Sequence, residues 1–308
     1  MPPKQETYRQ ALRPLLVAAL DSPGLLSPSE SRLARFSLNP DLRAHLLDPD
    51  IAALEDYLID FSQLPGRRAN LELIGAFADS VGALCTAPDL SLNRSYVAME
   101  WLLREFLVRH PPAVFGSDPD SPLQMPQICG AVAMGEWAAA FQHIEAGVAT
   151  LLEVGISPLW RVRESAAMGL QRLLRHRWDS TVRRLRRRIL DATAYEWRAL
   201  IAGIAEPDLL ADPDHALDAL DLHYAALASL RRLPPLVRRD PAVRTLRQAL
   251  GYSVSVVIAA TPAAGFAQAH AWITWDDPDV LWILRENVKK KRLSAWPDEL
   301  VALRDRLA

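Results

Sequence analysis

Arginine is concentrated between residues 160 and 190, where ten arginines stand against two acidic residues, Glu164 and Asp179. Like charges three or four residues apart on a helix repel, so an ordinary solvated face usually carries both signs. A dense run of guanidinium groups instead favours the binding of phosphates or carboxylates, which they recognise through paired hydrogen bonds. The candidate binding residues of this stretch are Arg161, Arg163, Arg172, Arg175, Arg183, Arg184 and Arg187.

A less specific interpretation of the same stretch stays open. Arginine outnumbers lysine by 31 to 4 in the whole chain, so its abundance alone is weak support for nucleic-acid binding. The counter-charges of the cluster can also come from a neighbouring helix, such as the acidic segment Asp212–Asp221. In that case the arginines form a solvated face whose ion pairs lie within the protein.

A second group of cations, Lys289–Arg292, follows Trp282 and Arg285 near the C-terminus. Aromatic side chains beside cations can stack on nucleic-acid bases. The further candidate binding residues are therefore Trp178, Trp282, Arg285, Lys289 and Lys290. Two structural alternatives stay open: most of the nine tryptophans fill the core, and Lys289–Arg292 form the C-terminal end of a helix, where cations are favoured.

Motifs for other kinds of chemistry are missing. The chain has no GxGxxG, GxxxxGK[ST], GxSxG or HExxH sequence, so nucleotide-binding, hydrolase and zinc-protease classes lack support. Cys85 and Cys129 stand alone without a CxxC partner. The acids and histidines of residues 212–223 crowd one segment, which is typical of a solvated acidic face. We therefore expect no metal site and no cofactor.

Composition sets the class of protein and the distribution of charge. Half of the 308 residues are hydrophobic and the net charge is −2, as in a soluble globular protein. Residues 1–150 carry 11 basic and 18 acidic residues, a net charge of −7, whereas residues 151–308 carry 24 and 19, a net charge of +5. The polar start MPPKQETYRQ lacks the apolar segment of a secretory signal, and no run is apolar enough to span a bilayer. We expect a cytoplasmic protein without a membrane partner.

Apolar residues recur at helical spacing along almost the whole chain. Trp178, Val182, Leu185 and Ile189 fall at i, i+4, i+7 and i+11, which places them on one stripe of a helix. Alternating apolar runs between hairpin turns, the signal of strands, are nearly absent. The pattern predicts an all-α protein.

One dipeptide, Asp-Pro, opens many of these segments. It occurs as Asp-Pro-Asp at Asp48, Asp118, Asp212 and Asp277, and as Asp-Pro-Ala at Asp240. An aspartate can accept hydrogen bonds from the unpaired N–H groups of the first helical turn. A proline at the next position loses nothing, since its missing N–H would have no partner there. Each of these sites is therefore predicted to begin a helix.

Three segments share a fuller pattern: Ser157–Leu174, Asp240–Val254 and Asp277–Lys290 each join a proline start to a valine and then to Ala or Leu at helical spacing. This pattern resembles the second helix of a HEAT repeat. Helix starts near Ser157, Ala194, Asp240 and Asp277 lie 37 to 46 residues apart, near the repeat length of about 40 to 47. The resemblance implies an α-solenoid of six or seven antiparallel helix pairs, with HEAT-like repeats over residues 126–308 and atypical helical repeats or a cap over residues 1–125.

A narrower resemblance concerns the sequences RWDSTVRR (Arg177–Arg184) and WILRENVKK (Trp282–Lys290). They look like segments of the HEAT-like DNA glycosylases that excise alkylated purines. The resemblance implies that Trp178 and Trp282 contact DNA and that Asp179 stabilises the developing oxocarbenium ion. The family's acid is expected about one turn after the tryptophan, where Val182 and Arg183 stand here.

Two functions follow as expectations. The first is a non-enzymatic binding or scaffold protein whose concave, locally Arg-rich surface takes an acidic protein partner or nucleic acid. The alternative is an alkylpurine DNA glycosylase of DNA repair, with Asp179 as the catalytic residue. They differ in whether methylated purine is released from DNA and in whether the release depends on the Asp179 carboxylate.

Overall fold

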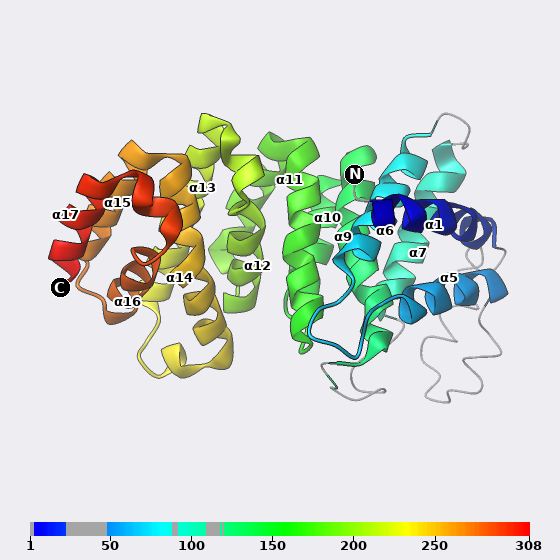
Figure 1. The fold of residues 1–308 in the computed structure, drawn as a ribbon, viewed down its shortest axis with the longest axis horizontal. Helices are drawn as coiled ribbons and strands as arrows, with labels where there is room; N and C mark the ends of the chain where they lie inside the picture. The colour runs from blue at the N-terminus through cyan, green and yellow to red at the C-terminus, as the bar shows by residue number, and fades with distance from the viewer. Residues whose placement is uncertain (1–2, 23–47, 88–91, 109–117, 119) are drawn as a thin grey trace. The chain divides into compact units, whose positions relative to one another are not determined.

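The structure, a computed structural model, describes residues 3–22, 48–87, 92–108, 118 and 120–308. Within these residues all regular structure is helical and no strand is present (Figure 1). The prediction of an all-α protein is confirmed for this part of the chain. Of the helices described, none combines the length and the apolar character needed to cross a membrane.

The chain divides into two compact units, residues 1–173 (unit 1) and residues 174–308 (unit 2). Within unit 1, α9 (Met125–Ala140) contacts α6 (Leu71–Cys85) and α7 (Leu92–Val108) extensively. An apolar surface buried against earlier helices ties α9 to the N-terminal part of the chain.

Unit 1 is built around α9. Its residues from Met125 to Ala139 are all buried, because all but Gln127 and Glu136 are apolar or small. A Cβ atom on Gly135 would lie 2.1 Å from the carbonyl oxygen of Gly169, so the approach of α11 to α9 requires glycine. The remaining helices of the unit are α1 (Pro3–Asp21), α5 (Pro49–Asp60), α10 (Ile144–Val154) and the first part of α11 (Trp160–Arg188), with a 3₁₀ turn η1 at Pro122–Gln124.

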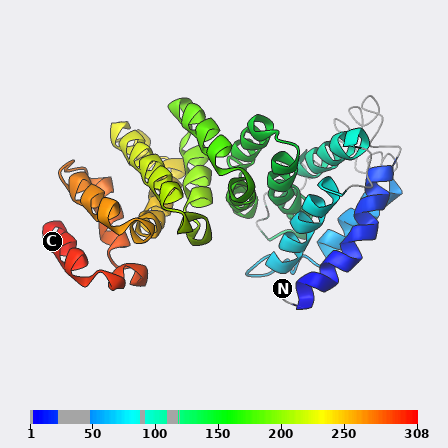
Figure 2. The same ribbon diagram turned by 90° about the horizontal axis from the view of Figure 1, so that it is seen from above.

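Unit 2 begins within α11 and continues through six further helices. These are α12 (Ala194–Ile204), α13 (Pro213–Arg232), α14 (Pro241–Ala260), α15 (Pro262–Ile273), α16 (Pro278–Asn287) and α17 (Pro297–Leu307), with 3₁₀ turns η2 (Ile189–Asp191), η3 (Pro207–Ala211), η4 (Val237–Arg239) and η5 (Lys291–Ala295). Each helix from α12 to α17 contacts the next in sequence, and α14 also packs against α12 and α16. Figure 2 shows them following one another in chain order along the unit.

The Asp-Pro helix starts are confirmed at four of five positions. Asp48, Asp212, Asp240 and Asp277 are the N-caps of α5, α13, α14 and α16, and each side chain accepts a backbone N–H of the first turn. Asp118 differs: its carboxylate accepts the N–H of Asp120, but the next helical turn begins at Pro122 behind a separate cap at Ser121. The prediction of a helix start at Asp118 is wrong, since a local turn uses its carboxylate.

The prediction that Lys289–Arg292 end a helix is also wrong in detail. Helix α16 stops at Asn287, and only Arg285 lies in its last turn. The buried Asn287 amide donates to the carbonyls of Leu250 (2.8 Å) and Ile283 (2.7 Å), and its oxygen accepts the N–H of Ser255 (2.7 Å). These bonds fix the end of α16 against α14, so the four cations follow the helix in a turn and in η5.

Candidate functional site

The arginines at the start of α11 make contacts within unit 1. Arg161 is only 5% exposed; it donates to the carbonyl of Gly66 (2.7 Å) and pairs with Asp120 (3.0 Å). Arg163 donates to the carbonyl of Ser157 (2.6 Å), just before the helix. Both guanidinium groups thus hold neighbouring backbone in place.

Arg172 is the centre of a charged network in unit 1. Its guanidinium pairs with Asp79 and with Glu136 (2.9 Å), and Asp79 also binds Arg9 and accepts from Gln5 (2.9 Å). Burial raises the pKa of Asp79, but the hydrogen bonds and charges of Arg172 and Arg9 outweigh this and hold that pKa below its usual range. Arg172 joins α11 to α1, α6 and α9 through these partners.

Further along α11, in unit 2, acidic residues pair with the arginines. Arg186 binds Asp218 (2.6 Å) and Asp221 (3.3 Å) of α13, and Arg188 binds Glu196 (2.7 Å) of α12. The alternative interpretation, in which the acidic segment Asp212–Asp221 supplies counter-charges, is confirmed for Arg186. Carboxylates of α12 and α13 therefore pair with two arginines of the cluster, Arg186 and Arg188.

Other arginines of the cluster remain at the surface. Arg175, Arg183 and Arg187 are exposed, and Arg184 is half-buried. Arg183 and Arg187 line a small pocket of about 490 Å³ together with the exposed Asp179. The candidate catalytic carboxylate therefore shares a pocket with guanidinium groups of its own helix.

Trp178 faces the interior of unit 2. It is buried, its indole N–H donates to Asp218 (2.9 Å), and its ring stacks on His215 with 3.9 Å between the ring centroids. Val182 and Leu185 of the same stripe are buried too, as the helical spacing predicts. Three further tryptophans, Trp137, Trp197 and Trp272, are likewise buried.

Trp282 and Arg285 also make contacts inside unit 2. The guanidinium of Arg247 lies 3.9 Å above the Trp282 ring, and the Nε of Arg285 donates to the carbonyl of Leu307 (3.0 Å) in α17. The ring of Trp282 is thus already covered by one cation. Arg285 holds the last helix of the chain.

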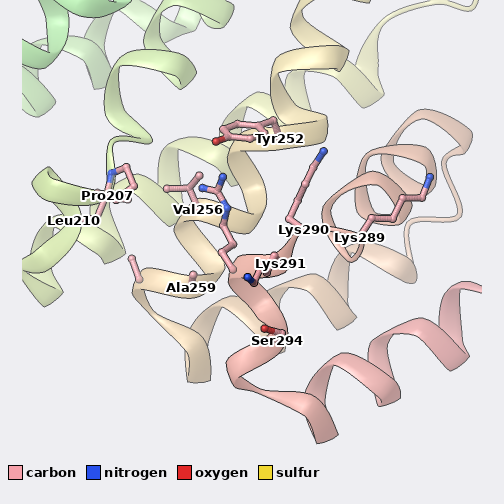
Figure 3. A pocket seen from close by; sticks show the side chains of 11 residues that line it. Pro207, Leu210, Tyr252, Val256, Ala259, Lys289, Lys290, Lys291 and Ser294 are labelled. Carbon is pink, nitrogen blue, oxygen red and sulfur yellow. The ribbon is translucent and has the colours of Figure 1, made fainter.

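A further pocket lies between α14, η3 and the segment after α16, entirely within unit 2 (Figure 3). It has a volume of about 890 Å³. Leu210 of η3 and Val256 and Ala259 of α14 line it with apolar surface, and Lys289–Arg292 line it with cationic side chains. The end of α16 at Asn287 is what places these four cations beside α14.

Tyr252 stands at the edge of this pocket with 54% of its surface exposed. The guanidinium of Arg292 lies 4.5 Å, and the ammonium of Lys290 5.6 Å, from the centre of its ring, within the range of cation–π attraction. Lys289 pairs with Glu286 (2.6 Å), and its hydrogen bond holds the pKa of Glu286 below the usual range. No carboxylate of the described residues pairs with Lys290, Lys291 or Arg292.

Of the residues that line this pocket, the sequence predicts Lys289 and Lys290 as binding residues, but not Tyr252 or the apolar residues of α14 and η3. Their helical spacing shows that Tyr252, Val256 and Ala259 share one face, since they fall at i, i+4 and i+7 of α14. That face is indistinguishable from an ordinary core face until the neighbouring segment is placed. Only the contact between α14 and the chain after α16 turns it into a pocket wall.

Neither cysteine is poised for chemistry. Burial, and next the charge of Glu136, raise the pKa of Cys85 to about 12, and burial raises the pKa of the fully buried Cys129 even further. The thiolate is the reactive form. We therefore expect both thiols of the native protein to react with a disulfide reagent at pH 8 far more slowly than those of the urea-unfolded protein. Rapid release of the coloured thiol product from native protein would contradict this.

The described part of the chain contains no group of side chains that could bind a metal ion. No three His, Cys, Asp or Glu side chains there converge in a way that could hold a metal ion. Comparison with known proteins gives no matching family, no matching curated protein and no matching solved structure.

Proposed function

We propose that unit 2 is a HEAT-like α-solenoid that serves as a non-enzymatic docking module for an acidic segment of a protein partner. The observation that carries the proposal is the pocket at Tyr252, which apolar residues of α14 and η3 line together with the cations of Lys289–Arg292. Such a pocket suits a segment that presents apolar and acidic side chains together. The free thiols fit the reducing environment of the cytoplasm, where we place the protein.

The order of helix contacts supports the solenoid. Helices α12 to α17 contact one another in sequence, and α14 lies between α12 and α16. In a solenoid, each pair buries its apolar faces only against its neighbours. We assign the pairs α13/α14 and α15/α16, in which α14 and α16 are the second helices and begin with the Asp-Pro starts at Asp240 and Asp277.

An acidic protein segment suits the surface better than nucleic acid does, for two reasons. A strip that follows a phosphate backbone needs uninterrupted cations, whereas Asp218 and Asp221 bind Arg186 in the middle of the arginine cluster. Trp178 is buried, so its ring is not presented for stacking on a base. Aliphatic wall residues such as Val256, by contrast, match apolar side chains of a peptide.

Fluorescence anisotropy with a labelled peptide of alternating Glu and Leu tests the proposal. We expect it to bind the wild-type protein more tightly than the same peptide with Gln in place of Glu. Replacing Lys290 and Arg292 by Gln should weaken binding by about tenfold or more, since a charge-assisted hydrogen bond contributes about 1.5–3 kcal/mol. The matched control replaces the exposed Arg232 and Arg239 by Gln and should bind as wild type does.

Two results would overturn the proposal. One is equal binding of the acidic and the neutral peptide; the other is an unchanged affinity in the Lys290/Arg292 variant. Binding of random duplex DNA that is tighter than peptide binding, and that weakens steeply with salt, would replace the acidic segment by nucleic acid.

The second candidate function, alkylpurine DNA glycosylase, is favoured by one observation: Asp179 shares a pocket with the exposed Arg183 and Arg187. A carboxylate there could stabilise positive charge on a sugar while the arginines bind phosphates. Incubation with DNA containing methylated purines tests it. Release that Asp179→Asn abolishes would support this function, and release that survives the substitution would rule out Asp179 as the catalytic residue.

A further inference from the structure

A second pocket, separate from the proposed docking site, lies within unit 1 and has a volume of about 390 Å³. Its inner surface is apolar, with the buried Ile74 of α6 and Ile128 of α9 and the half-buried Met168 of α11. At its mouth stand two large apolar side chains that are unusually exposed, Leu71 (58%) and Trp160 (45%). Covering them removes apolar surface from water, which favours the binding of an apolar group.

The mouth of this pocket is also cationic. Arg67 and Arg68 line it, both are exposed, and neither pairs with a carboxylate of the described residues. Glu164 contributes one carboxylate to the same pocket, and Arg161 pairs with Asp120 and lies 4.4 Å from the centre of the Trp160 ring.

The loop that carries these arginines is held on several sides. The side-chain amide of Asn70 donates to the carbonyl of Phe61 and to the hydroxyl of Tyr8, both at 2.9 Å. Arg161 donates to the carbonyl of Gly66 (2.7 Å). A Cβ atom on Gly66 would lie 2.5 Å from the carbonyl oxygen of Gln63, so the loop requires glycine there. Cations presented by a fixed loop lose less entropy when a ligand binds than those on a free loop.

We propose that this pocket binds a small organic monocarboxylate with an aromatic or aliphatic body. The body fills the space between Trp160, Leu71 and the buried isoleucines, in a volume typical of small-molecule sites. The carboxylate accepts hydrogen bonds from Arg67 and Arg68, whose planar guanidinium groups match its two oxygens. Glu164 disfavours a doubly charged phosphate in the same position, because a second negative charge is repelled more strongly.

Isothermal titration with 1-naphthylacetate, its uncharged amide and 1-naphthyl phosphate tests this proposal on the full chain. We expect naphthylacetate to bind more tightly than either of the other two. The double variant Arg67→Gln/Arg68→Gln should weaken the binding of naphthylacetate by about tenfold or more. The variant Trp160→Ala should weaken the binding of all three ligands. Both arginines are exposed, so the double variant is expected to keep the thermal stability of wild type.

The control variant is Arg13→Gln, which removes an exposed arginine of unit 1 outside this pocket and should leave binding unchanged. Equal affinity for the acid and the amide, or an unchanged affinity in the Arg67/Arg68 variant, would overturn the proposal. Tighter binding of the phosphate would overturn the choice of a monocarboxylate. Because the Lys290/Arg292 variant should bind naphthylacetate like wild type, failure of this site is distinguishable from failure of the docking function.

Discussion

Replacing Arg172 by leucine is expected to lower the stability of unit 1 by about 3–5 kcal/mol. The side chains of Asp79 and Glu136, 18% and 10% exposed, would remain in the interior without their common counter-charge. The loss should appear as a lower temperature of thermal unfolding by circular dichroism. Faster hydrogen exchange of the α6 and α9 amides should accompany it, because these helices carry the two carboxylates.

The matched control is Arg175→Leu, three residues further along the same helix, where the side chain is exposed. It should change stability by no more than about 0.5 kcal/mol. If Arg172→Leu costs as little as the control, the two carboxylates are solvated well enough to need no partner, and the network contributes nothing to the fold.

The stabilities of wild type and of Arg172→Leu should depend differently on pH. The pKa of Asp79 is lower in the folded protein, so its contribution is present above the pKa of the unfolded chain, about 4, and is lost as the pH falls through the folded value. The stability of wild type should therefore approach that of Arg172→Leu as the pH is lowered toward 3. A difference that is the same at pH 7 and pH 3 would contradict this.

The second large effect concerns His223, a fully buried residue of α13. Its Nδ1–H donates to the carbonyl of Ala219 (2.7 Å), since a carbonyl only accepts, so its Nε2 accepts from the hydroxyl of Ser253 (3.0 Å). Burial lowers its pKa from 6.5 to about 4, although the bond to Ala219 acts in the opposite direction. The folded state therefore holds the imidazole neutral.

Because the folded pKa is depressed, the contribution of His223 is complete above pH 6.5 and is lost as the pH falls toward 4. We expect unit 2 to lose about 2 kcal/mol between pH 7.5 and 5, and about 3 kcal/mol by pH 4, from this residue alone. Urea unfolding monitored by tryptophan fluorescence at these values measures the loss.

His223→Gln isolates the effect, since glutamine keeps polar atoms near Ser253 without a titrating group. The variant is expected to be less stable than wild type at pH 7.5 but to lose about 2 kcal/mol less on acidification to pH 5. Parallel stability curves for the two proteins would show that His223 does not titrate with a lowered pKa. The variant His215→Gln, which replaces a half-buried histidine stacked on Trp178, gives a second stability curve to compare with that of wild type.

Local interactions explain which features of this protein were predictable. An aspartate followed by proline begins a helix at Asp48, Asp212, Asp240 and Asp277, because both effects operate within one turn of backbone. The buried stripe of Trp178, Val182 and Leu185 was predictable for the same reason, since 3.6 residues per turn fix which side chains share a face.

Which arginines are paired and which are exposed was not predictable. Arg172 and Arg175 have the same chemistry and lie on the same helix, yet the first is paired inside unit 1 and the second is exposed. The difference arises from carboxylates that are distant in the chain, Asp79 and Glu136, which α6 and α9 bring to Arg172. Charge density along a sequence therefore says little about which cations are available to a partner.

The amino-acid sequence by itself determined that the described chain is helical, where most helices begin and which faces they bury, because these follow from hydrogen bonds and periodicity within a few residues. The tertiary structure alone decided where a binding surface can lie. It ended α16 at Asn287, brought Lys290 and Arg292 beside Tyr252, and set Arg67 and Arg68 at the mouth of an apolar pocket. These groups converge only when helices far apart in sequence pack together, and that packing depends on the sum of many weak apolar contacts.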